Sequence, residues 1–157
     1  SNRLNAENAE ENSRPSESTH VKTVLDLEVV YNLSSIELEK NSFEKRPRSL
    51  WRYYELLPVN DKTKIIDLGA GFTPLRECKR LASLLGARKV YAKDDTVNPT
   101  GSFKDRPATV AVSKALEFGF KAVGCASTGN LAAATAAHAA KAGIPCYVFI
   151  PSSTETN

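Results

Sequence analysis

Residues 121–150 read KAVGCASTGNLAAATAAHAAKAGIPCYVFI, and this stretch decides the fold class. A short apolar run over 121–126 predicts a strand, and the residues after it lead into a helix predicted over 129–142. Gly143 is expected to end that helix, because glycine tolerates the left-handed backbone found at helix C-termini. A second apolar run over 146–150 predicts another strand. A strand, a helix and a strand at this spacing are typical of a βαβ unit with parallel strands.

The same alternation extends upstream to residue 64. A helix is expected to start after Thr73 and Pro74 and to stop at Gly86, followed by a strand over 89–93. A further helix is expected over 107–118. The apolar face of the first of these helices consists of Leu75, Cys78, Leu81, Ala82 and Leu85. We therefore predict an α/β fold with an open, parallel, twisted sheet and flanking helices.

Composition divides the chain into three parts. Residues 1–22 are rich in Asn, Glu, Ser and Arg, and such a segment buries too little apolar surface to offset its ordering entropy. We predict that it is a flexible N-terminal tail. Residues 23–63 are predicted to form an arm with a short strand over 24–31 and a short helix over 49–57, whose aromatic residues indicate packing or a subunit contact. Residues 64–157 are predicted to form the α/β domain.

The overall composition argues against several classes of protein. The net charge is +3, and hydrophobic and charged residues make up 41% and 25% of the chain, which is typical of a globular domain. No basic run or RNA-binding signature is present, so nucleic acid is not an expected partner. The three cysteines lack the spacing of metal ligands, so no metal site is expected and a reducing compartment is indicated. No apolar run has the length of a membrane span and no signal peptide is recognised, so we expect a cytoplasmic protein without membrane association.

Lys104 lies in an unusual local sequence, Asn-Pro-Thr-Gly-Ser-Phe-Lys-Asp-Arg at residues 98–106. Pro107 fits the first turn of a helix that starts near Asp105. Lys104 is then placed just before this helix, at the sheet edge where ligands of α/β proteins bind. A helix N-terminus disfavours a nearby cation, and an amine that loses its proton readily is a better nucleophile toward an aldehyde. From these residues alone, Lys104 is either a reactive amine or an ordinary surface lysine.

A second loop, Ser127-Thr128-Gly129-Asn130, is predicted at the point where another strand runs into another helix. The free N–H groups of a helix start, two hydroxyls and a glycine that permits close approach suit an anion such as a carboxylate. The alternative is a plain helix cap by Ser127 or Thr128. Together the two loops offer a reactive amine and an anion site on one sheet edge, which amino-acid chemistry on an aldehyde cofactor requires.

These motifs resemble those of a known family. The run Lys93–Arg106 resembles the cofactor-lysine motif of the threonine synthases, which belong to the tryptophan-synthase-like, fold-type II pyridoxal-phosphate enzymes. Ser127–Asn130 resembles the second motif of that family at the expected distance. Gly71–Leu75 is similar to its Gly-x-Thr-Pro-Leu segment, and Ser49–Tyr53 is similar to a helix that precedes it. The resemblance covers roughly residues 26 to 157.

The resemblance implies the cofactor and the roles of individual residues. It implies that pyridoxal 5'-phosphate is bound covalently by Lys104, which afterwards moves substrate protons as an acid and a base. It implies that Asn130 hydrogen-bonds the phenolic oxygen of the cofactor and that Phe103 packs near its ring. The residues assigned to the substrate are Ser127, Thr128 and Gly129 for its carboxylate, and Lys93, Thr100 and Ser102 for its phosphate.

The activity implied by the resemblance is that of a lyase of threonine biosynthesis. O-phospho-L-homoserine and water would become L-threonine and phosphate, and the full-length enzyme would be a homodimer. Other fold-type II enzymes, such as serine/threonine dehydratases and cysteate synthases, are alternatives with the same machinery. A non-catalytic interaction fragment is an alternative from a different class.

The sequence departs from the family pattern in two ways. Ala70 stands where family members usually have an acidic residue. The glycine-rich loop for the cofactor phosphate and the Ser or Thr partner of the pyridine nitrogen come later in the family, and neither is found in these 157 residues. We therefore expect the sequence to be an N-terminal portion of the enzyme that is inactive by itself.

Overall fold

The computed structural model describes residues 29–154. The chain divides into two units with the boundary between Leu38 and Glu39, and the tail predicted over 1–22 lies outside the described residues. In the described part of the first unit, a 3₁₀ helix spans Leu33–Ser35. The strand expected over 24–31 falls mostly outside the described residues, and residues 29–31 lie in no strand.

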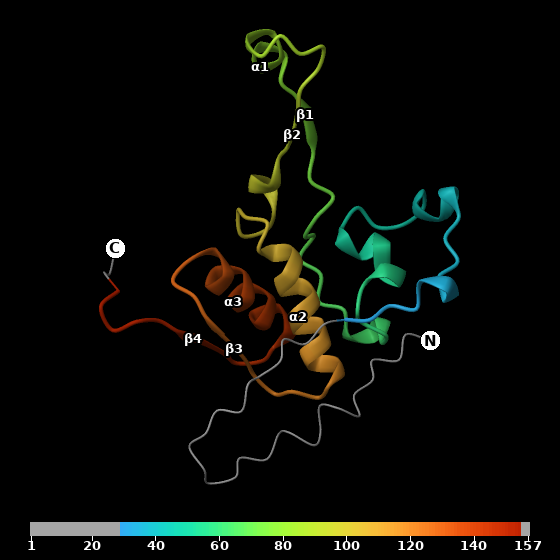
Figure 1. The fold of residues 1–157 in the computed structure, drawn as a ribbon. Coiled ribbons are helices and arrows are strands. Elements are labelled where there is room, and N and C mark those ends of the chain that lie inside the picture. Colours follow the sequence, from blue (N-terminus) through green and yellow to red (C-terminus); the bar gives the residue numbers. More distant parts are fainter. Residues whose placement is uncertain (1–28, 155–157) are drawn as a thin grey trace. The chain divides into compact units, whose positions relative to one another are not determined.

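The second unit carries the remaining helices and strands (Figure 1). The strands are β1 (Leu75–Glu77), β2 (Tyr91–Lys93), β3 (Val123–Ala126) and β4 (Cys146–Phe149). The α-helices are α1 (Lys79–Leu84), α2 (Asp105–Glu117) and α3 (Asn130–Ala142). Short 3₁₀ helices span Lys40–Phe43, Leu50–Leu56, Lys62–Lys64 and Asp95–Val97. Between residues 29 and 154, none of the helices has both the length and the apolar character needed to cross a membrane.

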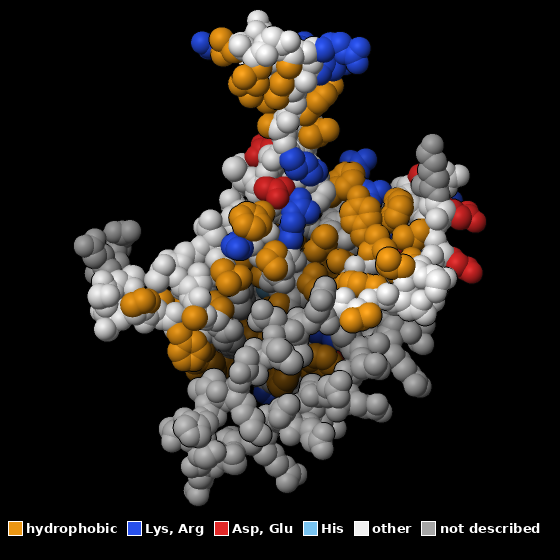
Figure 2. Space-filling model, in the orientation of Figure 1, with side chains coloured by type: hydrophobic (Ala, Val, Ile, Leu, Met, Phe, Trp, Pro, Cys, Tyr) orange, Lys and Arg blue, Asp and Glu red, His pale blue; other side chains and the backbone are white. Residues whose placement is uncertain are grey.

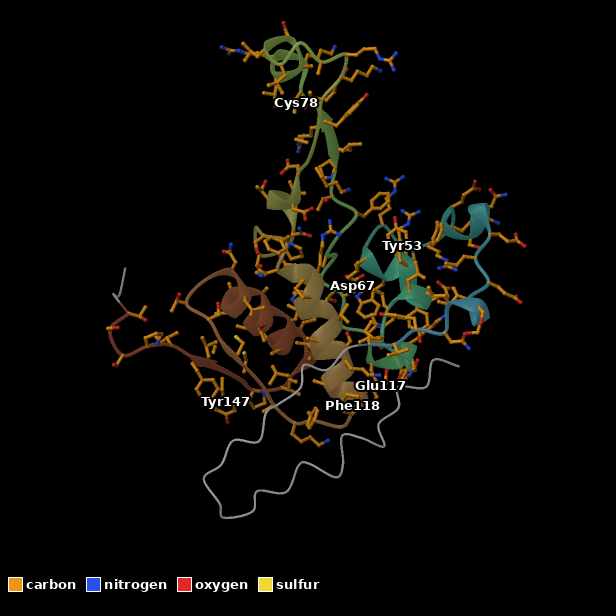
Figure 3. The ribbon with its side chains drawn as sticks, in the orientation of Figure 1. Tyr53, Asp67, Cys78, Glu117, Phe118 and Tyr147 are labelled. Atoms are coloured by element: carbon orange, nitrogen blue, oxygen red, sulfur yellow. The ribbon has the colours of Figure 1, made fainter. Side chains whose placement is uncertain are left out.

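The elements β3, α3 and β4 form the βαβ unit that the sequence predicts. The two strands pair in parallel, from Val123 opposite Cys146 to Ala126 opposite Phe149. Gly143 follows α3 with a φ of 70°, which confirms the predicted left-handed helix stop. α3 packs against both strands (Figure 1). Tyr147 and Phe149 are 59% and 65% exposed, and Figure 3 shows Tyr147 on the side of β4 away from α3.

α2 packs against α3, and small side chains bury this contact. Ala108 and Val112 of α2 are almost completely buried, as are Ala134 and Ala139 of α3. α2 begins at Asp105, where the position of Pro107 predicts it, because a proline in the first turn gives up no intrahelical hydrogen bond. The two helices therefore form the core of the described domain.

The segment between Thr73 and Gly86 differs from the prediction. Residues 75–77 form β1, which pairs antiparallel with β2, and α1 starts only at residue 79. The predicted helix start at Thr73 and Pro74 is wrong, because main-chain bonds hold the chain extended on both sides of β1. The Cys78 N–H donates to the Val90 carbonyl at 2.8 Å, and the Asp94 N–H donates to the Pro74 carbonyl at 3.0 Å. The strand expected over 89–93 is shorter than predicted, and its pairing is antiparallel rather than parallel.

The helical spacing of apolar residues in this segment marks a surface rather than a core. Of the predicted apolar face only Ala82 is buried, while Leu75, Leu81 and Leu85 are 63%, 45% and 65% exposed. Figure 2 shows hydrophobic side chains beside Lys and Arg on the segment formed by β1, α1 and β2. Two-stranded sheets and helices thus give a mixed α/β architecture, of which the β3–β4 pair is the parallel part.

A polar stripe on α2 binds the main chain of irregular segments before β1 and after β2. The stripe consists of Asp105, Thr109, Ser113 and Glu117, which lie four residues apart and so share one side of the helix. Thr109 Oγ1 donates to the Ile66 carbonyl, and Ser113 Oγ accepts the Ile66 N–H at 2.9 Å. Glu117, labelled at the end of α2 in Figure 3, accepts the N–H groups of Asn60 and Asp61 at 2.7 and 3.1 Å. The stripe therefore satisfies backbone groups that no sheet binds.

The helix predicted over 49–57 is present as the 3₁₀ helix Leu50–Leu56. Ser49 caps it by accepting the Trp51 N–H at 3.3 Å. The Trp51 ring is 6% exposed, and its Nε1–H donates to Thr109 Oγ1 at 3.0 Å. The Trp51 side chain therefore packs inside the domain. For this residue, packing rather than a subunit contact is the interpretation that the structure supports.

We predict that Thr109→Val destabilises the protein by roughly 2–4 kcal/mol. The change keeps the shape of the side chain but leaves the Trp51 Nε1–H and the Ile66 carbonyl without their partner, and each such group costs about 1–3 kcal/mol when buried. Thr135→Val is the matched control, because Thr135 is also buried and its hydroxyl binds only the Leu131 carbonyl of its own helix. Urea unfolding of the natural-length protein measures both losses, and equal losses would contradict the role of the stripe.

Candidate functional site

Lys104 lies directly before α2, as predicted, and serves as its N-cap residue. Its main-chain N–H donates to Ser102 Oγ at 3.2 Å. Its Nζ lies 4.6 Å from the centre of the Phe103 ring, and among the described residues it meets no hydrogen-bond acceptor or carboxylate. Phe103 is 54% exposed and Lys104 is half-buried. The amine therefore lies beside an aromatic ring and forms no ion pair with another described residue.

The loop that carries Lys104 has a defined shape. Gly101 has a φ of 75°, which favours glycine, and its N–H donates to the Asn98 carbonyl at 2.8 Å. The N–H and the hydroxyl of Thr100 both donate to Asp105 Oδ2 at 2.8 Å. These bonds connect the start of the loop to the first residue of α2, and Lys104 lies between the connected points.

The same loop is attached to the segment that precedes β1. Asn98 is 5% exposed, accepts the Gly71 N–H through Oδ1 at 2.9 Å and donates through Nδ2 to the Asp95 carbonyl at 2.9 Å. Gly71 has a φ of 83°, and a Cβ there would lie 3.0 Å from the main-chain nitrogen of Leu50. Only glycine fits this position. Ala70 beside it is fully buried, so the residue that departs from the family pattern has no exposed side chain.

Arg106 connects three segments through one carboxylate. Its Nη2 donates to Asp95 Oδ1 at 2.8 Å and to Thr73 Oγ1 at 3.1 Å, and its Nε donates to Asp95 Oδ2 at 3.2 Å. Thr73 Oγ1 donates to Asp95 Oδ1 at 2.5 Å. These hydrogen bonds, from Arg106 first and then from Thr73, lower the pKa of Asp95 to about 2. The segment around Thr73 is thereby fixed to the first turn of α2, next to Lys104.

The second loop leaves the start of α3 open. Gly129 is the N-cap residue and provides no side-chain cap, while Ser127 Oγ accepts the Gly129 N–H at 3.3 Å within the loop. The first N–H groups of α3, beginning at Asn130, therefore have no acceptor from a capping side chain or from the helix itself. Thr128 and Asn130 are exposed. Neither Ser127 nor Thr128 caps α3 with its side chain. The N–H groups that are expected to bind an anion therefore have no capping acceptor among the described residues.

The two loops are carried by helices in direct contact. Asp105, the first residue of α2, lies beside His138 of α3, with 3.8 Å between Asp105 Oδ1 and His138 Nδ1. Asn130 begins the same helix eight residues before His138, a distance of about 12 Å along the axis. Lys93 lies on β2 rather than on either loop; it is exposed, and its Nζ donates to the Thr73 carbonyl.

Several residues of the site were not identified from the sequence. Asp105 and Arg106 follow Lys104 directly, yet only the structure shows that they fix the loop. Asp95 and Asn98 lie in the same motif and bind its main chain and Arg106. The one signal for His138 is a large polar residue in a helix made mostly of alanine.

Comparisons with known proteins show which sequences this chain resembles. The family described as pyridoxal-phosphate dependent enzymes matches residues 66–157. The threonine synthase of Methanocaldococcus jannaschii is 46% identical over 127 residues, which cover 80% of this chain and 31% of the relative. The threonine synthase of Methanosarcina acetivorans is 49% identical over 125 residues, covering 80% and 30%. That of Synechocystis sp. is 51% identical over 100 residues, covering 63% and 26%. The chain thus spans about a third of the length of the curated relatives it matches.

The Asp95 carboxylate makes the stability of the site depend on pH. Its folded pKa of about 2 lies below the ordinary value of 3.8. Its contribution to stability is therefore fully present above about pH 4 and is lost as the pH falls from about 4 to about 2. The difference amounts to roughly 2 kcal/mol, which solvent around this partly exposed pair reduces to roughly 1 kcal/mol.

We predict that Asp95→Asn is less stable than the unmodified protein above pH 4 and equally stable near pH 2. Unfolding free energies measured by urea between pH 2 and pH 6 test this. Asp67→Asn is the control, because it also removes one negative charge but from a carboxylate that binds only a main-chain N–H, that of Gly69. A loss for Asp95→Asn that stays constant across this pH range would contradict the ion pair.

Proposed function

Because this chain belongs to the family of pyridoxal-phosphate dependent enzymes, as its motifs predict, we propose that the whole protein is a threonine synthase. It converts O-phospho-L-homoserine and water to L-threonine and phosphate. The observation that carries the proposal is the position of Lys104, with an amine free of partners among the described residues, ahead of a helix in contact with α3. The threonine synthases that match at 46–51% identity support the choice within the family.

The described residues fit pyridoxal phosphate on three counts. The Lys104 amine meets no acceptor in the described part of the chain, so it is available to an aldehyde. The Phe103 ring beside it is half-exposed and offers an apolar surface to a flat ring. The uncapped N-terminus of α3 offers N–H groups to an anionic oxygen.

Each residue then has a distinct role in the proposed reaction. When bound, the cofactor supplies an aldehyde and a conjugated ring that accepts electrons from the amino-acid substrate. Lys104 holds the cofactor through its amine and afterwards moves protons to and from the substrate carbons. Asn130 would donate a hydrogen bond to the phenolic oxygen, and Phe103 would pack near the ring. The loop Ser127–Gly129 binds the substrate carboxylate with its main-chain N–H groups and hydroxyls.

We propose Lys93, Thr100 and Ser102 for the phosphate of the substrate. Lys93 uses one N–H donor on the Thr73 carbonyl and keeps two others. Ser102 Oγ accepts the Lys104 N–H and keeps its own hydroxyl hydrogen to donate. Thr100 directs both its N–H and its hydroxyl to Asp105, so it would have to exchange one of these bonds for the phosphate.

We also propose that β3 and β4 belong to a larger parallel sheet of the fold-type II kind. α3 packs against these strands, while Tyr147 remains exposed on the side away from α3. Phe149 is also exposed and shares the face of Tyr147, because alternate residues of a strand point to the same side. Exposed aromatic side chains on a strand face are typical of a sheet that a further layer covers. Further parallel strands would bind the free main-chain groups at the edges of the pair.

Borohydride reduction of the natural-length protein with pyridoxal phosphate tests the anchor. We predict that the label is found on Lys104 after peptide mapping, because this amine has no partner among the described residues. A label on Lys93 or Lys114 would contradict the assignment. Phosphate release from O-phosphohomoserine without formation of threonine would assign the protein a different activity within the same family.

Asn130→Ala tests the anion site separately. We predict a shifted visible absorption of the bound cofactor and a binding constant weakened by about tenfold or more, because a hydrogen bond to a charged group contributes roughly 1.5–3 kcal/mol. Asn60→Ala is the control, since it removes an exposed amide outside both motifs. An Asn130→Ala protein with the spectrum and affinity of the control would remove Asn130 from the site.

A further inference from the structure

Two ionisable side chains are completely buried where α2 meets α3. Asp105 of α2 and His138 of α3 are both 0% exposed. They come from residues 33 positions apart in the sequence, and the 3.8 Å between Asp105 Oδ1 and His138 Nδ1 links the two helices. None of the roles in the proposed function uses either side chain.

The hydrogen bonds of this pair are unevenly distributed. Asp105 Oδ2 accepts two bonds from Thr100, while Oδ1 has no hydrogen-bond partner among the described residues. His138 Nδ1 lies 2.8 Å from the Ala134 carbonyl, which only accepts, so Nδ1 carries a hydrogen. His138 Nε2 is buried and likewise lacks a partner within the described part of the chain.

Burying a carboxylate costs free energy unless its oxygens are hydrogen-bonded, so the burial of Asp105 calls for an explanation. The N-terminus of α2 favours the negative charge, and Thr100 satisfies one oxygen. An apolar residue beside Ala108 and Val112 would avoid the cost altogether. What the carboxylate provides instead is a fixed connection between Thr100, which starts the lysine loop, and the side of α3.

We propose that Thr100, Asp105 and His138 form a buried lock that positions Lys104 relative to the start of α3. Asp105 holds the loop through Thr100, and its contact with His138 sets where α2 begins along α3. The lock thereby fixes the spacing between the Lys104 amine and the anion site at Asn130. These are positioning residues: they act on the reaction through Lys104. The proposal rests on the proposed function, in which Lys104 binds pyridoxal phosphate.

The rate at which Lys104 captures the cofactor tests the lock. Natural-length apoprotein is mixed with pyridoxal phosphate without substrate, and the covalent product is trapped with borohydride at set times and counted on the Lys104 peptide. We expect Thr100→Val to slow the capture at least tenfold, because it removes the hydroxyl bond to Asp105. Thr100→Ser keeps that hydroxyl and should capture at nearly the original rate. Thr135→Val controls for a lost buried hydroxyl, and melting temperatures control for stability.

A double-substitution cycle tests the part of His138. Asp105→Asn removes the charge, and His138→Asn keeps a donor for the Ala134 carbonyl while it removes the ring. If the two residues act as one lock, the doubly substituted protein captures the cofactor no more slowly than the slower single variant. Slowing factors that simply multiply would overturn the coupling. If Asp105→Asn fails to fold, the Thr100 pair alone decides, since Thr100 is half-buried and the change is nearly isosteric.

The outcomes separate the two proposals. No label on Lys104 in the unmodified protein would overturn the proposed function. A label on Lys104 that forms at the same rate in Thr100→Val, Thr100→Ser and Thr135→Val would overturn the lock and leave the proposed function standing. Slow capture in Thr100→Val with rescue by Thr100→Ser supports the lock, because a loss of stability alone would not follow the hydroxyl.

Discussion

The polar stripe on α2 is the constraint on which the rest of the described domain depends. Thr109, Ser113 and Glu117 bind main-chain groups of residues 60–66, a stretch with no sheet of its own. Asp105, at the start of the same stripe, binds Thr100. Buried main-chain groups without partners are costly, so this one helix determines where irregular segments on either side of β1 and β2 can lie. The stripe connects stability to the site, because its first member also shapes the loop that carries Lys104.

The site follows from the way α2 and α3 meet. Small residues such as Ala108 and Ala134 bury the contact and bring the helices close together. Each helix begins with a different chemical group: α2 begins with an amine ahead of its first turn, and α3 begins with open N–H groups. Arg106 binds both Asp95 and Thr73, and these bonds attach the segment around Thr73 to the first turn of α2. The candidate site would owe its geometry to the contact of these two helices, because the loops with Lys104 and with Ser127–Gly129 directly precede them.

Sequence patterns predicted the parts of this arrangement that local chemistry determines. Gly143 and Pro107 mark a helix end and a helix start by their own backbone preferences, and both predictions are confirmed. The helix predicted from Leu75 is wrong, because β1 is held by pairing with residues that follow some 16 positions later, a contact that periodicity does not reveal. The burial of Asp105 against His138 is equally non-local. The motifs point to Lys104 and Asn130, whereas the contacts of Asp105 with Thr100 and His138 are visible only in the structure.

Hydrogen exchange of individual amides, measured with and without pyridoxal phosphate in the natural-length protein, tests the central claim most directly. The claim is that α2 fixes the lysine loop before any ligand arrives and that the start of α3 stays open until one does. The account predicts slow exchange at Thr100 and Ile66 in both states, because Asp105 and Ser113 bind these amides. It predicts fast exchange at the first amides of α3 that slows when the cofactor binds. Fast exchange at Thr100 in the free protein would contradict this account. So would exchange rates at the first-turn amides of α3 that are the same with and without the cofactor.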